Sequence, residues 1–417
     1  MKIVHIYDGH ERVAVGQGSV PTIVYNLAKY TAREGHEVVV LERRWSGLSK
    51  EEEVDGISFR RINLRMGSNI PCAEVPYNQI KSLPGITRLI ANKIEFAFKA
   101  LGHLKRESFD VVHAHLPFAA NVLVTLNNGL CDRMVYTAHV GEEGKRFGFT
   151  PSTPVLLRLF SPDMHLMRRS KRSVVLNEDL RRKLMVHKGI DPEKLKVIPN
   201  GIEVEEYGKF REEELDEVRK RYGLEAGVTV MFSGTITPRK GVKVLIRAGE
   251  AIIKRGYKDV LFLLCGNYEI DKDFTNEVVK YVNSKGLSKY FKFTGFVPHR
   301  DLRILYFACD AFVLPSFEEG FGLSLLEALA SGKPVIGSDV GGIKMMIRDG
   351  WNGFLFRPGN DKELADKLEY LIENDHERRR MSINSRKLAE ERFDWRIVVK
   401  QYIDVYEEVG VWKSGSS

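Results

Sequence analysis

Short apolar segments alternate with longer amphipathic segments along the whole chain. Those expected as strands are KIVHI, EVVVL, ISFRRI, DVVHAH, RMVYTA and RSVVL in the first half, and VTVMFS, VLFLLC, YFKFTG, AFVLP, PVIGS and GFLF in the second. Between them lie helical patterns such as TIVYNLAKYTAREG and KVLIRAGEAIIKRG, each ending at a glycine that can stop a helix. Strands that alternate with helices predict parallel sheets with helices on both faces. Because the pattern runs twice, we predict an α/β protein of two doubly wound, Rossmann-like domains.

The boundary between the two domains is expected within residues 197–210, where Pro-Asn-Gly signals a turn and a highly charged helix pattern follows. We therefore predict an N-terminal domain over residues 1–200 and a C-terminal domain over residues 201–393. Residues 394–412 read as an amphipathic helix that packs back on the first domain. Doubly wound sheets bind ligands outside the carboxyl ends of their strands, so the cleft between the domains is the expected site.

The composition is that of a soluble globular protein, with 417 residues of which 43% are hydrophobic and 29% charged. No apolar run reaches the roughly 18 residues that span a bilayer, and the first residues lack the pattern of a signal peptide. The four cysteines lie far apart without a metal or disulfide motif, which predicts reduced thiols. These features predict a cytoplasmic protein.

The net charge of +8 is unevenly distributed. Residues 81–106 contain six Lys or Arg against one Glu, and residues 158–188 contain nine against three acidic residues. Such segments can attract phosphorylated ligands, anionic lipid or nucleic acid, or can be solvated helix faces. Nucleic-acid binding has no support beyond the charge, because no basic segment is interleaved with aromatic residues. The first segment also carries Ile, Leu and Phe, so it could rest on an anionic membrane surface, although a core-packed helix with one solvated side is favoured.

A glycine-containing turn, FEEGFG, leads from the expected strand AFVLPS into the helix pattern LSLLEALASG. Free backbone N–H groups at such a helix start can bind phosphate. Glu319 lies in the turn and Glu327 just over one turn inside the helix, so both carboxylates should avoid the phosphate and accept hydrogen bonds from neutral hydroxyls beside it. A nucleotide sugar has hydroxyls on both sides of its diphosphate and fits this arrangement. The alternative for Glu319 is a helix cap.

The pair Glu319 and Glu327, within GFGLSLLEALASGKPVI, resembles the paired-glutamate motif of retaining glycosyltransferases with the GT-B fold, in particular family 4 (glycosyl transferases group 1). The resemblance covers nearly the whole chain and includes GSVPTIVYNLAKYTAREGHEVVVL, DVVHAH, KLKVIPNGIE, FSGTITPRKGVKVLIRA, FKFTGFVPHRDLRILYFACDAFVLPS and DGWNGFLFRPGN. It implies two Rossmann-like domains facing across a cleft, and transfer of a hexose from a nucleotide-diphosphate sugar to an acceptor hydroxyl.

For the second domain, the resemblance implies that Glu319 contacts hydroxyls of the donor sugar near the reacting centre. Glu327 would hold the ribose hydroxyls. Sugar and phosphate oxygens would bind to the backbone of four residues, Gly320, Phe321, Gly322 and Leu323.

The resemblance also assigns the segment FSGTITPRKG to the leaving diphosphate. Arg239 and Lys240 would neutralise the charge that grows on it. Many family members carry arginine directly after the first glycine, where this chain has Thr235, and Arg239 could compensate. The backbone at Phe296 and Val297 would contact the nucleobase, although a plain strand–loop–helix connection explains these residues as well.

In the first domain, the resemblance places Gly18 and Ser19 in a loop that closes over the donor phosphates and faces the acceptor. His139 matches the histidine beside the donor sugar, where a purely structural histidine is the alternative. His113 and His115 are expected to support the edge of the sheet.

The resemblance implies no metal and no cofactor. Asp271 and Asp273 match a short Asp-x-Asp pattern of metal-dependent transferases, but they are expected in a solvated loop. The implied donor is of the UDP-glucose or GDP-mannose type, and the acceptor is a sugar, glycan or lipid-linked molecule. Glu319→Gln or Lys240→Ala is expected to abolish transfer while leaving folding intact.

Two other classes of function remain open from the sequence. One is a nucleotide-sugar epimerase or phosphorylase with the same fold. The other is a catalytically silent sugar- or lipid-binding module, which the departures from the family pattern at Thr235 and at Lys344–Met345 leave possible.

Overall fold

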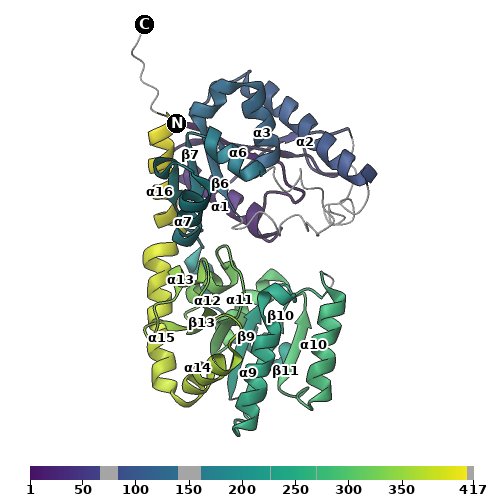
Figure 1. The fold of residues 1–417 in the computed structure, drawn as a ribbon, viewed down its shortest axis with the longest axis vertical. Coiled ribbons are helices and arrows are strands. Elements are labelled where there is room, and N and C mark those ends of the chain that lie inside the picture. The colour runs from purple at the N-terminus through teal and green to yellow at the C-terminus, as the bar shows by residue number, and fades with distance from the viewer. Residues whose placement is uncertain (66–82, 140–160, 226, 269, 411–417) are drawn as a thin grey trace. The chain divides into compact units, whose positions relative to one another are not determined.

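The structure is a computed structural model, which describes residues 1–65, 83–139, 161–225, 227–268 and 270–410 (Figure 1). The chain divides into two compact units, one formed by residues 1–201 with the segment from residue 395 onward, the other by residues 202–394. The division falls one residue after the expected boundary. The C-terminal helix α16 (Trp395–Gly410) belongs to the first unit.

The described part of the first unit is built on an eight-stranded sheet with the order β3-β4-β2-β1-β5-β6-β7-β8. Its strands are β1 (Lys2–Tyr7), β2 (Glu37–Arg43), β3 (Glu51–Val54), β4 (Ile57–Ile62), β5 (Val111–Ala114), β6 (Met134–Ala138), β7 (Arg172–Val175) and β8 (Leu195–Val197). Strand β3 pairs antiparallel with β4, whereas the other pairings are parallel. The expectation of a wholly parallel sheet is therefore wrong at this edge. The sequence EEEV was missed because glutamate disfavours strands, yet an edge strand leaves these side chains in solvent.

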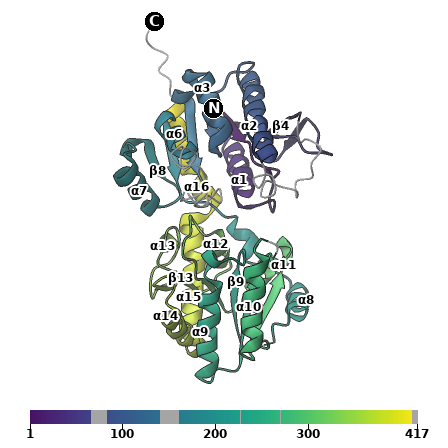
Figure 2. The same ribbon diagram turned by 45° about the vertical axis from the view of Figure 1, so that its right-hand side comes forward.

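Helices cover both faces of the first sheet (Figure 2). They are α1 (Ser19–Arg33), α2 (Leu83–Leu104), α3 (Pro117–Leu126), α6 (Pro162–Arg169), α7 (Glu178–Lys188) and α16. Strand β2 shows why, because its side chains alternate between two cores. Val39 and Leu41 join the core with α2, α3, α6 and α7, whereas Val38 and Val40 join the core with α1. Each such fully buried side chain contributes about 1.5–3 kcal/mol.

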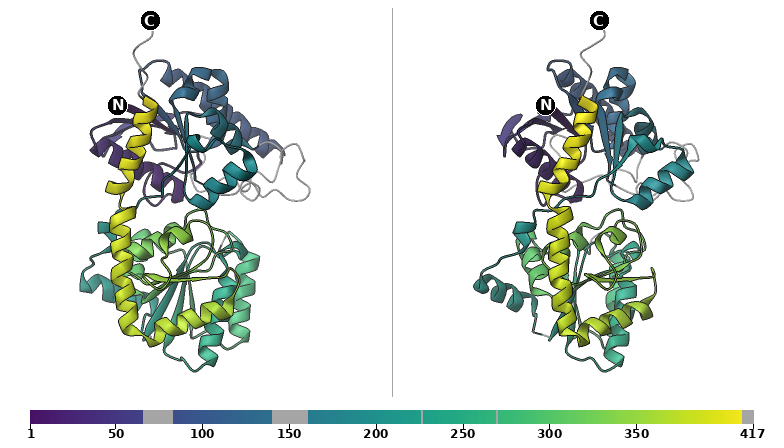
Figure 3. Two further views of the ribbon diagram at one scale, coloured as in Figure 1. Left: turned by 60° about the vertical axis from the view of Figure 1, so that its left-hand side comes forward. Right: turned by 90° about the vertical axis from the view of Figure 1, so that its left-hand side faces the viewer.

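Helix α16 closes the first unit, where it packs against α1, β5 and β6 (Figure 3). Trp395 at its start is fully buried, and a Cβ on Gly201 would come within 2.5 Å of its ring. Near its end, Glu408 forms ion pairs with Arg172 (2.9 Å) and Lys196 (2.7 Å). Buried aromatic contacts therefore hold the helix on the sheet, and exposed charges add little.

The second unit contains a six-stranded parallel sheet with the order β11-β10-β9-β12-β13-β14. The strands are β9 (Val228–Ser233), β10 (Val260–Cys265), β11 (Phe291–Gly295), β12 (Ala311–Leu314), β13 (Val335–Ser338) and β14 (Gly353–Phe356). All six segments expected as strands in this half form strands. The chain runs outward from β9 to one edge and then returns to place β12 on the other side of β9. The strand order therefore reverses between β9 and β12, which is where such sheets bind ligands.

The second unit has helices between consecutive strands of this sheet, one helix before β9 and two after β14. They are α8 (Glu212–Tyr222), α9 (Val242–Lys254), α10 (Lys272–Ser284), α11 (His299–Ala308), α12 (Leu323–Ala330), α13 (Ile343–Met346), α14 (Asp361–Glu373) and α15 (Asp375–Leu388). Asp271 caps α10, since its side chain accepts a hydrogen bond from the Phe274 amide at 3.1 Å. The Asp-x-Asp pattern is thus a helix start, and its expected placement in a solvated loop is wrong.

Candidate functional site

Two loops meet where the strand order of the second sheet reverses. One leaves β9 and includes the short 3-10 helix Pro238–Lys240, and the other leaves β12 and leads to α12. The Phe317 amide donates a hydrogen bond to the Arg239 carbonyl at 2.9 Å. Gly241 has a φ of +67°, and a Cβ there would lie 1.8 Å from the Pro315 carbonyl oxygen. The two loops therefore pack so closely that only glycine fits between them.

This packing brings Lys240 and Glu319 together. The Lys240 Nζ lies 2.6 Å from the Glu319 Oε2, and the two side chains are 12% and 10% exposed. The Ser316 hydroxyl donates a second hydrogen bond to the same carboxylate oxygen at 3.2 Å. Helix α12 begins after Gly322 without a side-chain cap, so the interpretation of Glu319 as a helix cap is wrong. Glu319 is instead a nearly buried carboxylate held by a lysine and a hydroxyl.

Arg239, next to Lys240 in sequence, is exposed and lies at the rim of this pair. Its guanidinium donates to the Glu318 carbonyl at 3.0 Å. That bond uses one of its five N–H donors, so the side chain can still bind an anion.

A third loop, which follows β13, packs closely against the turn that carries Glu319. Gly341 has a φ of +44°, and a Cβ there would lie 1.9 Å from the Glu319 carbonyl oxygen. A Cβ on Gly342 would lie 2.5 Å from the Phe321 Cα. The Gly342 amide also faces the Glu319 carbonyl at 3.3 Å. The backbone of residues 320–323 is thereby fixed at the start of α12, where the first amides of the helix have no partner within it.

Glu327 lies one turn into α12 and beneath two tyrosines. The Tyr207 hydroxyl donates to its Oε1 at 3.3 Å. The Tyr306 hydroxyl is close enough to interact with the charge, but it is buried without a hydrogen-bond partner among the described atoms. Burial raises the pKa of Glu327 to about 7, and the tyrosine hydroxyls only partly offset this effect. Its carboxylate is therefore an acceptor that ligand hydroxyls would stabilise in the charged form.

The segment after β11 has two different side-chain environments. Phe296 is 76% exposed and Val297 is 6% exposed. Val297 packs in the core, so only the backbone and the Phe296 ring are accessible to a ligand. The expected contact with a nucleobase stays a prediction.

Three expected site residues belong to the first unit. Gly18 has a φ of +132° and precedes α1, whose first residue is Ser19, and both residues are exposed. His139 follows β6 and is partly buried. Its Nε2 lies 3.0 Å from the Nδ1 of His115. The backbone at Gly18 needs glycine, since side chains rarely adopt this conformation.

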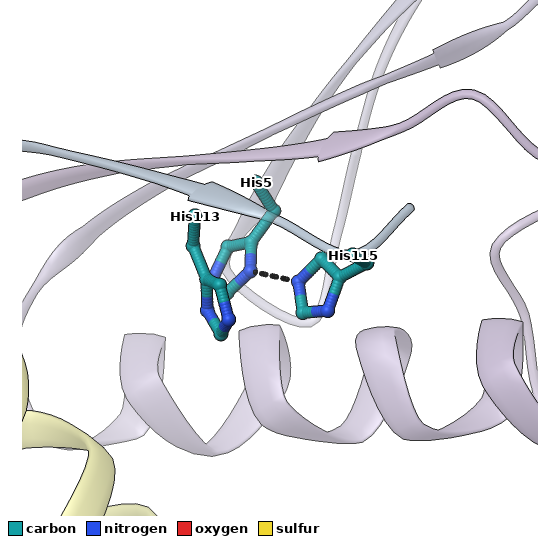
Figure 4. A group of neighbouring side chains, drawn as sticks. All are labelled: His5, His113 and His115. Atoms are coloured by element: carbon teal, nitrogen blue, oxygen red, sulfur yellow. Dashed lines mark hydrogen bonds between the residues drawn. The ribbon is translucent and has the colours of Figure 1, made fainter. Parts of the chain in front are cut away.

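Three residues next to the candidate residues were not predicted from the motifs. In the second unit, Ser316 and Tyr207 contact the paired glutamates; in the first unit, His5 contacts His115 (Figure 4), and His115 in turn contacts His139. The His113–His115 pair was expected at the sheet edge, but β5 lies inside the sheet between β1 and β6. The sequence feature that could have indicated this buried histidine group is His5, a polar residue within an otherwise apolar segment.

Several solved structures match nearly the whole of this chain. Sucrose-phosphate synthase from Thermosynechococcus elongatus has a TM-score of 0.77 at 18% identity and covers 98% of both chains. HepE from Anabaena in complex with UDP-glucose has a TM-score of 0.70 at 21% identity, covering 98% of this chain and 100% of that one. The chain has the GT-B fold of glycosyltransferases, which confirms the expected fold class.

Family comparisons of the sequence agree with the fold. The model described as Glycosyltransferase Family 4 matches residues 20–206, and Glycosyl transferases group 1 matches residues 216–388. The D-inositol 3-phosphate glycosyltransferase of Corynebacterium glutamicum is 26% identical over 396 residues, which are 94% of this chain and 92% of that protein. The chain belongs to glycosyltransferase family 4, glycosyl transferases group 1.

Proposed function

We propose that this glycosyltransferase moves a hexose from a nucleotide-diphosphate sugar of the UDP-glucose type to a hydroxyl of a sugar, glycan or lipid-linked acceptor, with retention of configuration. The observation that carries the proposal is the Lys240–Glu319 pair. It places a cation and a carboxylate side by side beyond the carboxyl ends of β9 and β12, where sheets of this kind bind ligands. A diphosphate needs the cation and sugar hydroxyls need the carboxylate. HepE, which shares the fold, was solved with UDP-glucose, whereas a GDP-mannose type of donor is the second candidate.

In this proposal, the donor lies along the loops of the second unit. Glu319 accepts hydrogen bonds from sugar hydroxyls, and Glu327 accepts them from the ribose. The diphosphate binds to Arg239, Lys240 and the backbone amides of Gly320, Phe321, Gly322 and Leu323, and the base contacts the backbone at Phe296 and Val297. From the first unit, Gly18 and Ser19 contact the phosphates and His139 contacts the sugar.

The bond between the anomeric carbon and the phosphate oxygen breaks, and the bond to the acceptor oxygen forms on the same face of the sugar. The acceptor proton passes to the departing phosphate oxygen. Lys240 stabilises the negative charge on that oxygen, which is the main electrostatic requirement of the step. We propose that the chain supplies this charge itself and needs no metal.

The test is a panel of nucleotide sugars incubated with and without candidate sugar acceptors, in buffer containing EDTA. We expect one UDP-hexose to be consumed and the product to keep the anomeric configuration of the donor, as read by proton NMR. Inversion, or loss of activity in EDTA that Mg²⁺ restores, would contradict the mechanism. An epimerised donor or a sugar phosphate as product would favour an epimerase or phosphorylase. Absence of both transfer and donor hydrolysis across the panel would favour a silent binding module.

Glu327 should make nucleotide binding depend on pH. With its pKa at about 7, the free protein holds this carboxyl protonated in mild acid. We expect UDP to bind about tenfold more weakly at pH 5.5 than at pH 8, since a protonated carboxyl loses its charge-assisted bonds to the ribose. Glu327→Gln should bind weakly at both pH values. Isothermal titration with UDP and with 2′,3′-dideoxy-UDP checks this, because the dideoxy ligand should not distinguish the two proteins.

The ionisation of Glu327 also changes how the free energy of unfolding depends on pH. The folded pKa is raised above the usual 4.5, so between pH 4.5 and 7 the folded state binds more protons than the unfolded state. The contribution of Glu327 is thus fully present below pH 4.5 and is lost as the pH rises through 7. Glu327→Gln should remove this loss. Equal pH dependence of urea unfolding in both proteins would contradict the assignment.

Helix α2 carries an exposed apolar face, which bears on the proposed contact with an anionic membrane. One side of the helix packs in the core of the first unit, as the sequence favoured. On the other side Ile90, Ile94 and Phe98 are 53%, 41% and 55% exposed, and their spacing of four residues places them in one row. Arg88 and Lys99 are exposed on the same helix. Among the described residues, no helix is both long and apolar enough to cross a bilayer. We propose that this face rests on anionic lipid.

Phe98→Glu should therefore weaken binding to vesicles of phosphatidylglycerol and phosphatidylcholine about tenfold in co-sedimentation at low salt. Ile383→Glu is the matched control, because Ile383 is also exposed (70%) but lies alone on α15 of the other unit. Absence of binding by the unsubstituted protein at low salt would refute the membrane contact.

A further inference from the structure

An ion pair is buried in the first sheet, near the carboxyl ends of β2 and β4. Glu42 and Arg61 are register partners on these strands, and each side chain is 1% exposed. The Arg61 Nε donates to the Glu42 Oε1 at 2.7 Å. The other nitrogens of Arg61 bond to the Glu52 carboxylate on β3 at 2.6 Å and to the Ser49 carbonyl at 3.2 Å. The guanidinium therefore holds the Glu42 carboxylate in one orientation.

The second carboxylate oxygen of Glu42 bonds to a residue outside the sheet. Its Oε2 accepts a hydrogen bond from the Val13 amide at 2.8 Å. Val13 lies midway along the loop of residues 8–18, which joins β1 to α1 and ends at Gly18. The Val13 side chain is 1% exposed and packs in the core with α1. The backbone of Val13 is thus held by Glu42 and its side chain by the core.

The same loop is held at its start and on α1. At its start, Lys93 of α2 donates to the Asp8 carbonyl, and its Nζ lies 3.1 Å from the Asp8 Oδ2. Residues 15–19 are exposed. Within this exposed part, the Gly16 amide donates to the Thr22 hydroxyl of α1 at 3.1 Å. The exposed end of the loop therefore depends on buried contacts that precede it in the chain.

Stability alone does not explain why a charged pair occupies this buried position. Two apolar side chains of similar volume are commonly as stable there, because a buried ion pair must give up its water. Burial indeed raises the pKa of Glu42, and the Val13 amide and Arg61 only partly offset this effect. Two apolar side chains would, however, leave the Val13 amide buried without an acceptor. The loop would then have to move until this amide reached water.

We propose that Glu42 is a positioning residue, which fixes the loop of residues 8–18 so that Gly18 and Ser19 can contact the ligand. Arg61 holds the Glu42 carboxylate in place for this role. The contact of Gly18 and Ser19 with the donor phosphates rests on the proposed function. The anchoring of the loop does not, since it belongs to the free protein.

Two double variants separate the acceptor for Val13 from the ion pair. Glu42→Gln with Arg61→Met keeps an oxygen for the Val13 amide, whereas Glu42→Met with Arg61→Met removes it. Both lack the ion pair, and glutamine and methionine have similar volumes. Amide hydrogen exchange of the full chain without ligand is read at Val13 by NMR after selective ¹⁵N-valine labelling. We expect this amide to exchange about 100-fold faster in the variant without the oxygen than in the variant that keeps it.

The kinetic readout should follow the same order. Glu42→Met with Arg61→Met should lower kcat/KM for the donor about tenfold or more, and Glu42→Gln with Arg61→Met should keep most of it. Glu107→Gln is the control, because Glu107 pairs with Lys2 at the other end of β1, and it should change neither measurement.

Equal exchange at Val13 in the two double variants, or equal kcat/KM, would overturn the proposal. If the exchange rates differ as expected but the unsubstituted protein consumes no nucleotide sugar, the proposed function fails and the anchoring of the loop by Glu42 stands.

Discussion

Lys240→Met is expected to lower the rate of hexose transfer by about 100- to 1,000-fold, the usual effect of removing a group that stabilises developing charge. The same substitution should lower the free energy of unfolding by about 3 kcal/mol, because it leaves the Glu319 carboxylate nearly buried without its counter-charge. The sequence alone predicted that folding would be unaffected. The ion pair changes that expectation. Urea unfolding and single-turnover donor consumption measure the two effects separately.

The double substitution Lys240→Met with Glu319→Gln is the control. Removing both charges should return most of the lost stability, since a neutral amide can keep the bond from the Ser316 hydroxyl. Transfer should remain as low as in the single variants. If the double variant is as unstable as Lys240→Met alone, the unpaired Glu319 carboxylate is not the cause of the lost stability. If Lys240→Met keeps full turnover, the lysine has no role in the reaction.

Gly241→Ala should reduce transfer about 100-fold or more and destabilise the second unit by at least about 3 kcal/mol. A Cβ at this position would lie 1.8 Å from the Pro315 carbonyl oxygen, so the loop after β12 must move. That movement separates Glu319 from Lys240, and a displacement near 1 Å in an active site commonly costs about 100-fold in rate. The stability loss combines the strain of alanine at positive φ with the clash.

Gly286→Ala provides the matched comparison. Gly286 has a φ of +66°, almost that of Gly241, but a Cβ there would have no atom within 4 Å. The substitution should cost only the strain of the backbone, about 1–2 kcal/mol, and leave transfer unchanged. Equal losses of stability and activity in the two variants would show that backbone strain, and not the close approach of the two loops, determines the effect.

Most strands and the architecture could be predicted because apolar segments of the right length alternate with amphipathic helices, and that pattern depends only on neighbouring residues. The strands β3 and β8 were missed for the same reason. EEEV at β3 has a local preference against strands, which pairing at an edge overrides. The three residues of β8 are too few to give a pattern.

The motif around Glu319 and Glu327 was enough to indicate the family and the candidate residues of the donor site. The contacts of these residues could not be predicted, because they join positions far apart in the sequence. Glu319 meets Lys240 across 79 positions, and Glu327 meets Tyr207 across 120. The raised pKa of Glu327 follows from burial, which the sequence does not specify.

By itself, the sequence determined the class of fold, the two-domain organisation and the glycosyltransferase family, since periodicity and motif spacing are local properties. Only the tertiary structure decided how the chemical groups pair. Loop packing at the reversal of strand order converts a separate lysine and glutamate into one buried ion pair. Pairing of three neighbouring strands brings His5, His115 and His139 into hydrogen-bond contact with one another. The protonation state of a side chain and its ion pairs depend on the residues that surround it in the folded protein, and these are distant in the sequence.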